Sequence, residues 1–149
     1  MSPIRADLVP NRTVLHITGG DAAHFLQGLV TNDIHKTNAG PIYAAILTAQ
    51  GKYLADFLLL KQDAGFLLDT ASDLAPGLAQ RLTMYKLRAD VQIEATRLAV
   101  LRGQDPAPTG AIADPRSAAL GWRLYTETPP AHSATQIDWT ALYVANKIP

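Results

Sequence analysis

A short cationic and aromatic run ends a stretch of helical spacing near residue 85. Residues 84–88 read Met-Tyr-Lys-Leu-Arg, and Arg81 precedes them by about one helical turn. Cations in the last turn of a helix interact favourably with the helix dipole, which is one interpretation of the run. The other is a ligand that is anionic or flat and aromatic, against which Tyr85 could stack while Arg88 pairs with its charge. Composition leaves both interpretations open.

Further polar side chains stand beside apolar segments. Asp56 lies inside the most apolar predicted strand, residues 53–61. A carboxylate at such a place either faces solvent or is a positioned hydrogen-bond acceptor or base. The tripeptide Thr31-Asn32-Asp33 follows the first predicted helix, and its short polar side chains favour a loop that supplies more acceptors.

Other kinds of site lack their sequence patterns. There is no cysteine, which excludes disulfides, thiolate-bound zinc and a cysteine nucleophile within these residues. The histidines are not spaced as metal ligands, and the serines lack the Gly-x-Ser-x-Gly context of a nucleophile. The Gly19-Gly20 pair matches neither a dinucleotide nor a P-loop motif. We therefore expect no metal site and interpret the glycines as a turn before a helix.

The composition is that of a folded globular domain. Hydrophobic residues make up 48% of the chain, and 13 basic side chains balance 13 acidic ones. This excludes intrinsic disorder and argues against nucleic acid as a partner. No apolar run is long enough to span a bilayer, so no membrane partner is expected. The first residues lack the features of a signal or transit peptide, from which we expect a cytoplasmic protein.

The hydrophobic pattern predicts strands between isolated helices. Residues 13–17 suit a strand, and residues 22–30 suit a helix with Asp21 as its cap. Residues 43–48, 53–61 and 66–70 are apolar runs, and the connections between them contain glycines that suit the positive φ of hairpin turns. Three consecutive antiparallel strands are therefore expected.

The second half of the chain continues this alternation. A second helix is predicted to face the core with Leu74, Leu78, Leu82 and Tyr85. Residues 89–95 alternate strictly, and we expect residues 97–102 to form the neighbouring strand. A further strand is expected near residues 120–124, and a last helix near the carboxyl end. Hairpin-linked strands between isolated helices favour an α+β fold with antiparallel sheets and flanking helices.

Several segments together resemble one protein family. They read Leu-His-Ile-Thr-Gly-Gly-Asp-Ala (15–22), Phe-Leu-Gln-Gly-Leu-Val-Thr-Asn-Asp-Ile (25–34), Gln-Gly-Lys-Tyr-Leu-Ala-Asp (50–56), Met-Tyr-Lys-Leu-Arg-Ala-Asp-Val (84–91), and Asp-Pro-Arg (114–116) followed by Leu-Gly-Trp-Arg (120–123). In this order they are similar to the YgfZ family of folate-binding proteins, relatives of the glycine-cleavage T-protein, an aminomethyltransferase. The resemblance covers nearly the whole chain.

The resemblance implies a tetrahydrofolate-binding accessory protein for iron–sulfur cluster assembly or repair. Its ligand would be tetrahydrofolate or a derivative, and its partners iron–sulfur assembly or client proteins. It also implies a folate-binding α+β region over residues 1–149, with a first half-unit at about 12–95 and a second begun at about 96–149. The family's Lys-Gly-Cys-Tyr-x-Gly-Gln signature is missing, so we expect an amino-terminal fragment that lacks the carboxyl-terminal part of the family architecture.

Two alternative functions follow from the same resemblance. One is a folate-dependent aminomethyltransferase-like enzyme. The T-protein branch carries an acidic pair, of which Asp56 matches the second member while Ala55 stands at the first, so the resemblance leans away from catalysis. The other is a non-catalytic interaction module with the same fold.

The resemblance also indicates where a ligand should lie. Folate combines a flat pterin that carries hydrogen-bond donors with an anionic glutamate tail, which suit acceptors and cations respectively. We expect the wall of the site to consist of Thr31, Asn32, Asp33, Asp56, Tyr85, Lys86 and Arg88. None of these residues is assigned as an acid, base or nucleophile.

Overall fold

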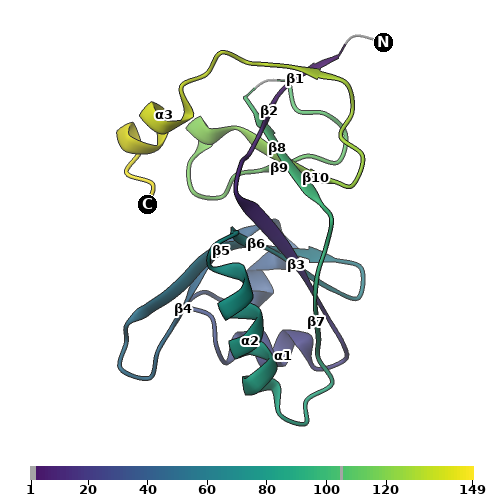
Figure 1. Cartoon of the computed structure of the whole chain (residues 1–149), viewed down its shortest axis with the longest axis vertical. Coiled ribbons are helices and arrows are strands. Elements are labelled where there is room, and N and C mark those ends of the chain that lie inside the picture. Colours follow the sequence, from purple (N-terminus) through teal and green to yellow (C-terminus); the bar gives the residue numbers. More distant parts are fainter. Residues whose placement is uncertain (1–2, 105) are drawn as a thin grey trace. The chain divides into compact units, whose positions relative to one another are not determined.

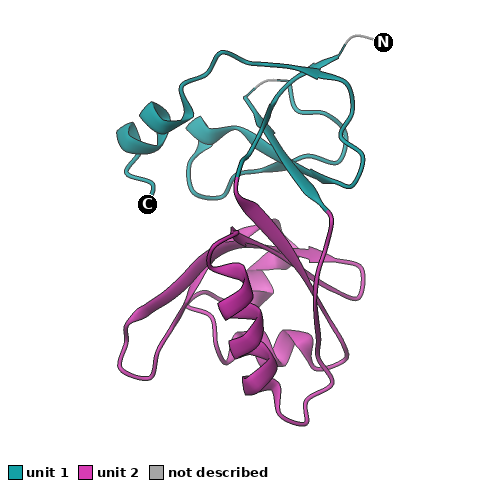
Figure 2. Cartoon of the chain, in the orientation of Figure 1, with its two compact units in different colours: residues 1–10, 98–149 teal, residues 11–97 magenta. Residues whose placement is uncertain are grey.

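The computed structural model describes residues 3–104 and 106–149. The chain divides into two compact units, one of residues 11–97 and one that joins residues 1–10 to residues 98–149 (Figures 1 and 2). Each unit has its own antiparallel sheet and helical segments, which confirms the expected α+β class. Within the described ranges, no helix is both long and apolar enough to cross a membrane.

The unit of residues 11–97 is built on a five-stranded antiparallel sheet (Figure 1). In spatial order its strands are β4 (Ile42–Leu47), β5 (Tyr53–Gln62), β6 (Gly65–Ala71), β3 (Arg12–Thr18) and β7 (Gln92–Ala95). Its helical elements are α1 (Ala22–Gln27), the 3-10 helix η1 (Ile34–Asn38) and α2 (Ala75–Lys86). The three strands expected as consecutive hairpins are β4, β5 and β6, which pair in that order.

Glycine has different roles in the two hairpins. Between β4 and β5, Gly51 has the expected positive φ of 83°. Between β5 and β6 it is Asp63 that has the positive φ, of 45°, because a short polar side chain tolerates this conformation. Gly65 is needed there for space, since a Cβ at this position would lie 2.2 Å from the carbonyl oxygen of Ile17. The expectation that glycine supplies the positive φ was therefore wrong for the second hairpin.

One face of the five-stranded sheet packs against the helices and forms the core. Alternate residues of β5, namely Ala55, Phe57 and Leu59, face this core together with Leu78 and Leu82 of α2. These residues are at most 4% exposed. Burying one large apolar side chain contributes about 1.5–3 kcal/mol, so this face is the main source of the unit's stability. Because side chains alternate along a strand, the residues between them belong to the opposite face.

The helices depart in detail from their expected boundaries. α1 ends at Gln27, and the carboxylate of Asp21 does not cap it. That carboxylate instead accepts a hydrogen bond from the N–H of Asp90 at 2.8 Å. On α2, Tyr85 is 38% exposed and not a core residue, because the helix ends at Lys86 and the chain turns away.

The strand expected beside residues 89–95 pairs elsewhere. β7 pairs with β3, whereas β8 (Ala99–Gly103) pairs with β10 (Trp122–Thr126) and with β2 (Asp7–Leu8). Strands that follow each other in a chain are usually neighbours, which was the basis of the expectation. Here the boundary between the two units falls in the link between these strands.

The other unit has a four-stranded antiparallel sheet in the order β2, β8, β10 and β9 (Ile112–Ala113). It also contains a parallel pair of β1 (Ile4–Arg5) and β11 (His132–Ser133), the 3-10 helix η2 (Ala118–Leu120) and the helix α3 (Trp139–Ala145). One small apolar cluster centres on Ala6, Leu101 and Trp122. The residues next to this cluster along the strands are charged. Arg102 of β8 is the register partner of Asp7 on β2 and of Arg123 on β10.

Tyr143 of α3 lies over this charged row. Its hydroxyl oxygen accepts hydrogen bonds from Arg116 at 2.9 Å and Arg123 at 3.0 Å, and Arg102 approaches it at 3.5 Å. Arg102 also stacks its guanidinium 4.5 Å from the centroid of the Trp139 ring. Burial by itself raises the pKa of Tyr143, but the nearby guanidiniums of Arg123 and Arg116 outweigh burial and hold that pKa below its ordinary value.

We expect the phenol of Tyr143 to ionise at a lower pH than an ordinary tyrosine, whose pKa is about 10. Since the pKa is lower in the folded state, the resulting stability is fully present above the unfolded pKa and is lost as the pH falls through the folded pKa. Tyrosinate absorbance during an alkaline titration measures this ionisation. Tyr143→Phe should remove the rise in tyrosinate absorbance that occurs at the lowest pH, and the control Tyr85→Phe should retain it. A titration curve that Tyr143→Phe leaves unchanged would contradict the expectation.

Candidate functional site

Asp56 is the centre of a polar cluster on the face of the five-stranded sheet opposite to the core. It lies between Ala55 and Phe57 of β5, both of which face the core. The hydroxyl of Tyr43 donates to its Oδ2 at 2.5 Å, and the hydroxyl of Tyr53 donates to its Oδ1 at 2.7 Å. Tyr43 is half-buried on β4, whereas Tyr53 is 57% exposed. Two phenols from adjacent strands therefore fix one carboxylate, and one of them is at the surface.

The carboxylate of Asp56 is ionised at neutral pH. Burial by itself raises its pKa, but the hydrogen bonds from Tyr43 and Tyr53 and the positive charge of Arg12 outweigh burial, so the pKa lies below its ordinary value. For Tyr53, burial and the contact with Asp56 both raise the pKa, which keeps this phenol protonated as a donor. An ionised carboxylate offers about four acceptor positions, of which the phenols use two. Asp56 can therefore also accept hydrogen bonds from a ligand.

A buried ion pair lies on the same sheet face. The Nε of Arg12 lies 2.6 Å from Oδ1 of Asp69, and Nη2 of Arg12 donates to the carbonyl oxygen of Asp69 at 2.8 Å. The side chain of Asp69 is fully buried, and that of Arg12 is 20% exposed. Removing one partner of such a pair typically costs about 3–5 kcal/mol, because the other charge is left buried and unpaired. The pair therefore holds the positive charge of Arg12 in a fixed position near Asp56.

The sequence pattern did not single out the tyrosines or the ion pair. The available signal was that Asp56 interrupts one apolar run and that Tyr43, a residue with a polar hydroxyl, begins the run on the neighbouring predicted strand. However, Tyr43 is the register partner of Leu58 and meets Asp56 along the diagonal. Long side chains reach diagonal neighbours, but which diagonal they reach depends on the register and twist of the folded sheet.

The polar loop after α1 lies along the outer edge of β4. The N–H of Thr31 donates to the carbonyl oxygen of Ala45 at 3.0 Å, and its Oγ1 accepts from the N–H of Ala45 at 2.9 Å. The Nδ2 of Asn32 donates to the carbonyl oxygen of Tyr43 at 3.0 Å. Because the hydroxyl of Tyr43 donates to Asp56, Tyr43 links Asn32 to the carboxylate of Asp56. The structure thus brings Thr31 and Asn32 to the edge of β4, the strand that pairs with the Asp56 strand β5.

The other expected site residues lie elsewhere. Asp33 uses its carboxylate to cap η1. Tyr85, Lys86 and Arg88 lie at or just beyond the end of α2, which packs on the core face of the sheet, opposite to Asp56. The structure therefore separates the cationic residues from the acceptors and does not form a single wall from them.

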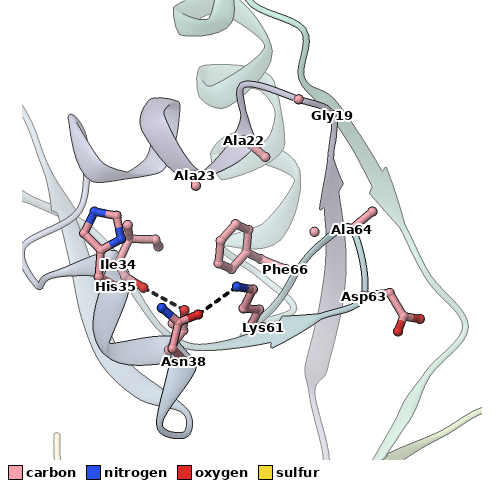
Figure 3. A pocket seen from close by; sticks show the side chains of 13 residues that line it. Gly19, Ala22, Ala23, Ile34, His35, Asn38, Lys61, Asp63, Ala64 and Phe66 are labelled. Carbon is pink, nitrogen blue, oxygen red and sulfur yellow. Dashed lines mark hydrogen bonds between the residues drawn. The ribbon is translucent and has the colours of Figure 1, made fainter.

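A pocket of about 290 Å³ lies between α1, η1 and the β5–β6 hairpin (Figure 3). Phe66 and Ile34 are buried beneath it, and Lys61 at its side donates to Oδ1 of Asn38 at 2.7 Å. Within the part of the chain that the structure describes, its lining includes none of the expected site residues. This pocket is distinct from the Asp56 cluster.

Comparison with known proteins gives consistent relatives, although no family model matches the chain. The chain is 35% identical over 145 residues to the mitochondrial iron–sulfur cluster assembly factor IBA57 homologue of Pyricularia oryzae, covering 86% of this chain. It is 33% identical over 146 residues to the mitochondrial iron–sulfur cluster assembly factor IBA57 of Homo sapiens, covering 78% of this chain. Among solved structures, it matches aminomethyltransferase T of the glycine cleavage system from Bartonella henselae with a TM-score of 0.59 and 18% identity, over 66% of this chain and 28% of that one. The relatives of this chain are therefore YgfZ-like IBA57 proteins, and its fold is that of aminomethyltransferase T.

The match is to part of longer proteins. This YgfZ-like chain covers 37% of the Pyricularia oryzae protein and 41% of the human one, about two fifths of their length. The match to aminomethyltransferase T confirms the expected fold of the T-protein and YgfZ type.

The expectation of a cytoplasmic protein was wrong. The similar proteins of Pyricularia oryzae, Homo sapiens and Mus musculus are all named as mitochondrial. The expectation rested on the first residues of the chain, whose composition does not decide the compartment. The comparisons point to mitochondria instead.

We expect the Asp56 cluster to make the stability of the YgfZ-like chain sensitive to acid. The pKa of Asp56 is lower in the folded protein than the ordinary value of 3.8, so its contribution is present above that value and is lost as the pH falls through the folded pKa. Tyr43→Phe removes one hydrogen bond and should lower the melting temperature by about 3 °C at neutral pH, and by less at a pH below the folded pKa. Circular dichroism melting curves measure this difference, with Asp63→Asn in the exposed hairpin turn as the control. An effect of Tyr43→Phe that is equal at both pH values would count against the cluster.

Proposed function

We propose that this YgfZ-like chain binds tetrahydrofolate or a derivative within an accessory factor for iron–sulfur cluster assembly or repair. The assembly role is supported by the likeness to IBA57 proteins, which are named as iron–sulfur cluster assembly factors. The folate role is supported by the T-protein fold and by the polar cluster around Asp56. Its protein partners would be iron–sulfur assembly or client proteins.

The observation that carries the folate proposal is the ionised carboxylate of Asp56. One edge of a pterin presents neighbouring N–H donors, and a carboxylate accepts such a pair through both oxygens. Tyr43 and Tyr53 hold the carboxylate in a fixed orientation while leaving acceptor positions for the ligand. Because Tyr53 is 57% exposed, its ring also offers a flat surface beside the acceptor.

The folate site would include only those expected residues that lie near this carboxylate. Thr31 and Asn32 bind the edge of β4 and would flank a ligand held by Asp56. Lys86 and Arg88 belong with α2 on the core face, so we do not include them in the folate site. A cation for the glutamate tail would have to come from another part of the protein.

We do not propose amine transfer for this chain. Ala55, at the first position of the acidic pair of the T-protein branch, is 2% exposed and faces the apolar core. On the face of Asp56, the carboxylate of Asp69 is held by Arg12. Amine transfer would need a second acidic group beside Asp56, whereas ligand binding needs only the carboxylate of Asp56.

Calorimetry with tetrahydrofolate and with its 5-formyl derivative on the full-length protein tests the folate site. Asp56→Ala should weaken binding about 10- to 100-fold, because a hydrogen bond to a charged group contributes about 1.5–3 kcal/mol. Asp63→Asn removes a negative charge from an exposed turn of the same unit and should leave binding unchanged. Equal affinities of the wild type and Asp56→Ala would exclude this carboxylate from the site.

The assembly role calls for a separate test in cells that lack their own copy of the gene. The wild-type gene should restore the activity of iron–sulfur enzymes, and the Asp56→Ala gene should restore less, if folate binding serves assembly. Enzymes without a cluster provide the control. Iron–sulfur enzyme activity that does not change when the gene is deleted would refute the assembly role.

A further inference from the structure

The carboxyl end of α2 exposes apolar side chains beside cations. Met84 is 62% exposed, Tyr85 38% and Leu87 84%. Arg81 and Arg88 are exposed as well, and Nη1 of Arg81 donates to the hydroxyl of Tyr85 at 3.3 Å. We call these five residues the α2 patch. Single exposed apolar residues are common, but adjacent ones between cations form a surface that a partner can cover.

An unfavourable backbone conformation presents Leu87 to solvent. Its φ is 48° and its ψ is −109°, and the N–H of Ala89 donates to the carbonyl oxygen of Lys86 at 2.8 Å. These are the features of a type II′ turn with Leu87 at the first central position, where glycine is the usual residue. A leucine there strains the backbone, and its exposed side chain gains little packing in return. Contact with another molecule would account for an apolar side chain at this position.

The turn after α2 is fixed to the rest of its unit. The Nζ of Lys86 donates to the carbonyl oxygen of Val91 at 2.7 Å. The carboxylate of Asp90 accepts from the N–H of Gly20 at 2.9 Å, and the N–H of Asp90 donates to the carboxylate of Asp21 at 2.8 Å. The α2 patch is therefore a preorganised surface, which loses little conformational entropy when a partner binds.

The charges around the α2 patch are mainly positive. Residues 81–90 contain Arg81, Lys86 and Arg88 against the single acid Asp90, whose carboxylate is already bonded to Gly20. The whole chain has 13 basic and 13 acidic residues, so this excess is local. The helix dipole explains a cation in the last turn, but Arg88 lies beyond the end of α2. Charge complementarity therefore favours an acidic partner.

A shallow pocket of about 180 Å³ continues the α2 patch along the helix. It is lined by Leu54, Ala55, Asp73, Leu74, Gly77, Leu78 and Arg81. The space beside Gly77 is open, since a Cβ at this position would meet nothing within 4 Å. Residues 77, 81 and 85 are spaced by four and share one face of α2, so Arg81 connects the pocket to the patch. A mostly apolar groove, with Arg81 where it joins the patch and Asp73 as its one acid, suits the apolar face of an amphipathic helix.

We propose that the α2 patch and its adjoining pocket dock an acidic amphipathic helix of a partner protein. The inference rests on the proposed function, because an assembly factor must meet assembly or client proteins. Leu87 and the pocket would receive apolar side chains, and Arg81 and Arg88 would pair with carboxylates. α2 and Asp56 lie on opposite faces of the sheet.

A labelled synthetic helix provides the probe. Fluorescence anisotropy of the full-length protein is measured with a peptide that has leucine on one face and glutamate on the other, and with a peptide that has lysine in place of glutamate. The acidic peptide should bind, and the double variant Arg81→Glu/Arg88→Glu should weaken it by about tenfold or more. Arg97→Glu, at another exposed arginine, is the matched control and should leave affinity unchanged.

Leu87→Gly separates docking from folding. Glycine relieves the strained turn, so this variant should melt at a higher temperature than the wild type while binding the acidic peptide more weakly. A purely structural role of Leu87 predicts no loss of peptide affinity, and that result would overturn the inference.

Other occupants are distinguished by the same assay. Equal affinity for the lysine peptide, no binding of the acidic peptide, or binding only of an RNA oligonucleotide or of phosphatidylserine vesicles overturns the proposal. So does a dimer in sedimentation experiments that Leu87→Gly dissociates, since the occupant is then a second copy. If the protein binds tetrahydrofolate but not the acidic peptide, only the docking proposal is refuted. If it binds the acidic peptide but no folate, only the folate site is refuted.

Discussion

The alternation of side chains along β5 is the constraint on which the rest of the candidate site depends. Ala55, Phe57 and Leu59 must face the apolar core, and a one-residue shift in register would move all of them to the opposite face of the sheet. The same alternation directs Asp56 to the opposite face, where the hydroxyl of Tyr43 reaches it from β4. The energy that orients the carboxylate therefore comes largely from burial of its apolar neighbours. Hydrogen bonds then define its charge state and its remaining acceptor positions.

Both units add paired charges to modest apolar cores. Arg12 pairs with the fully buried Asp69 in one unit, and Arg116 pairs with Asp114 at 2.7 Å in the other. Such pairs contribute little net stability over apolar residues, because removing two charges from water is costly. These pairs instead fix where the charged side chains lie, because a buried guanidinium is stable only in contact with its carboxylate. The charges of Arg12 and Arg116 are thereby held where they act on Asp56 and Tyr143 respectively.

Much of the fold was predictable because it depends on local patterns. The apolar runs that became β4, β5 and β6 were recognisable from alternation and turn residues. Predictions that used adjacency in the chain failed, as with β8, which pairs in the other unit. The site was predictable only in part. Asp56 and the loop at Asn32 were identified from residue type, but the tyrosines and the separation of α2 from them were not.

The sequence by itself determined the α+β class, the hairpins, the polar and cationic segments that could bind ligands, and a family resemblance that the comparisons confirmed. These depend on residue type and on spacing over a few positions. Only the tertiary structure decided which segments share a sheet face. It placed Tyr43 against Asp56, Arg12 against Asp69, and Leu87 in a strained turn at the surface. The physical reason is that strand register, the face of each strand and the end of a helix are set by burying the whole apolar core at once, and no local pattern contains that information.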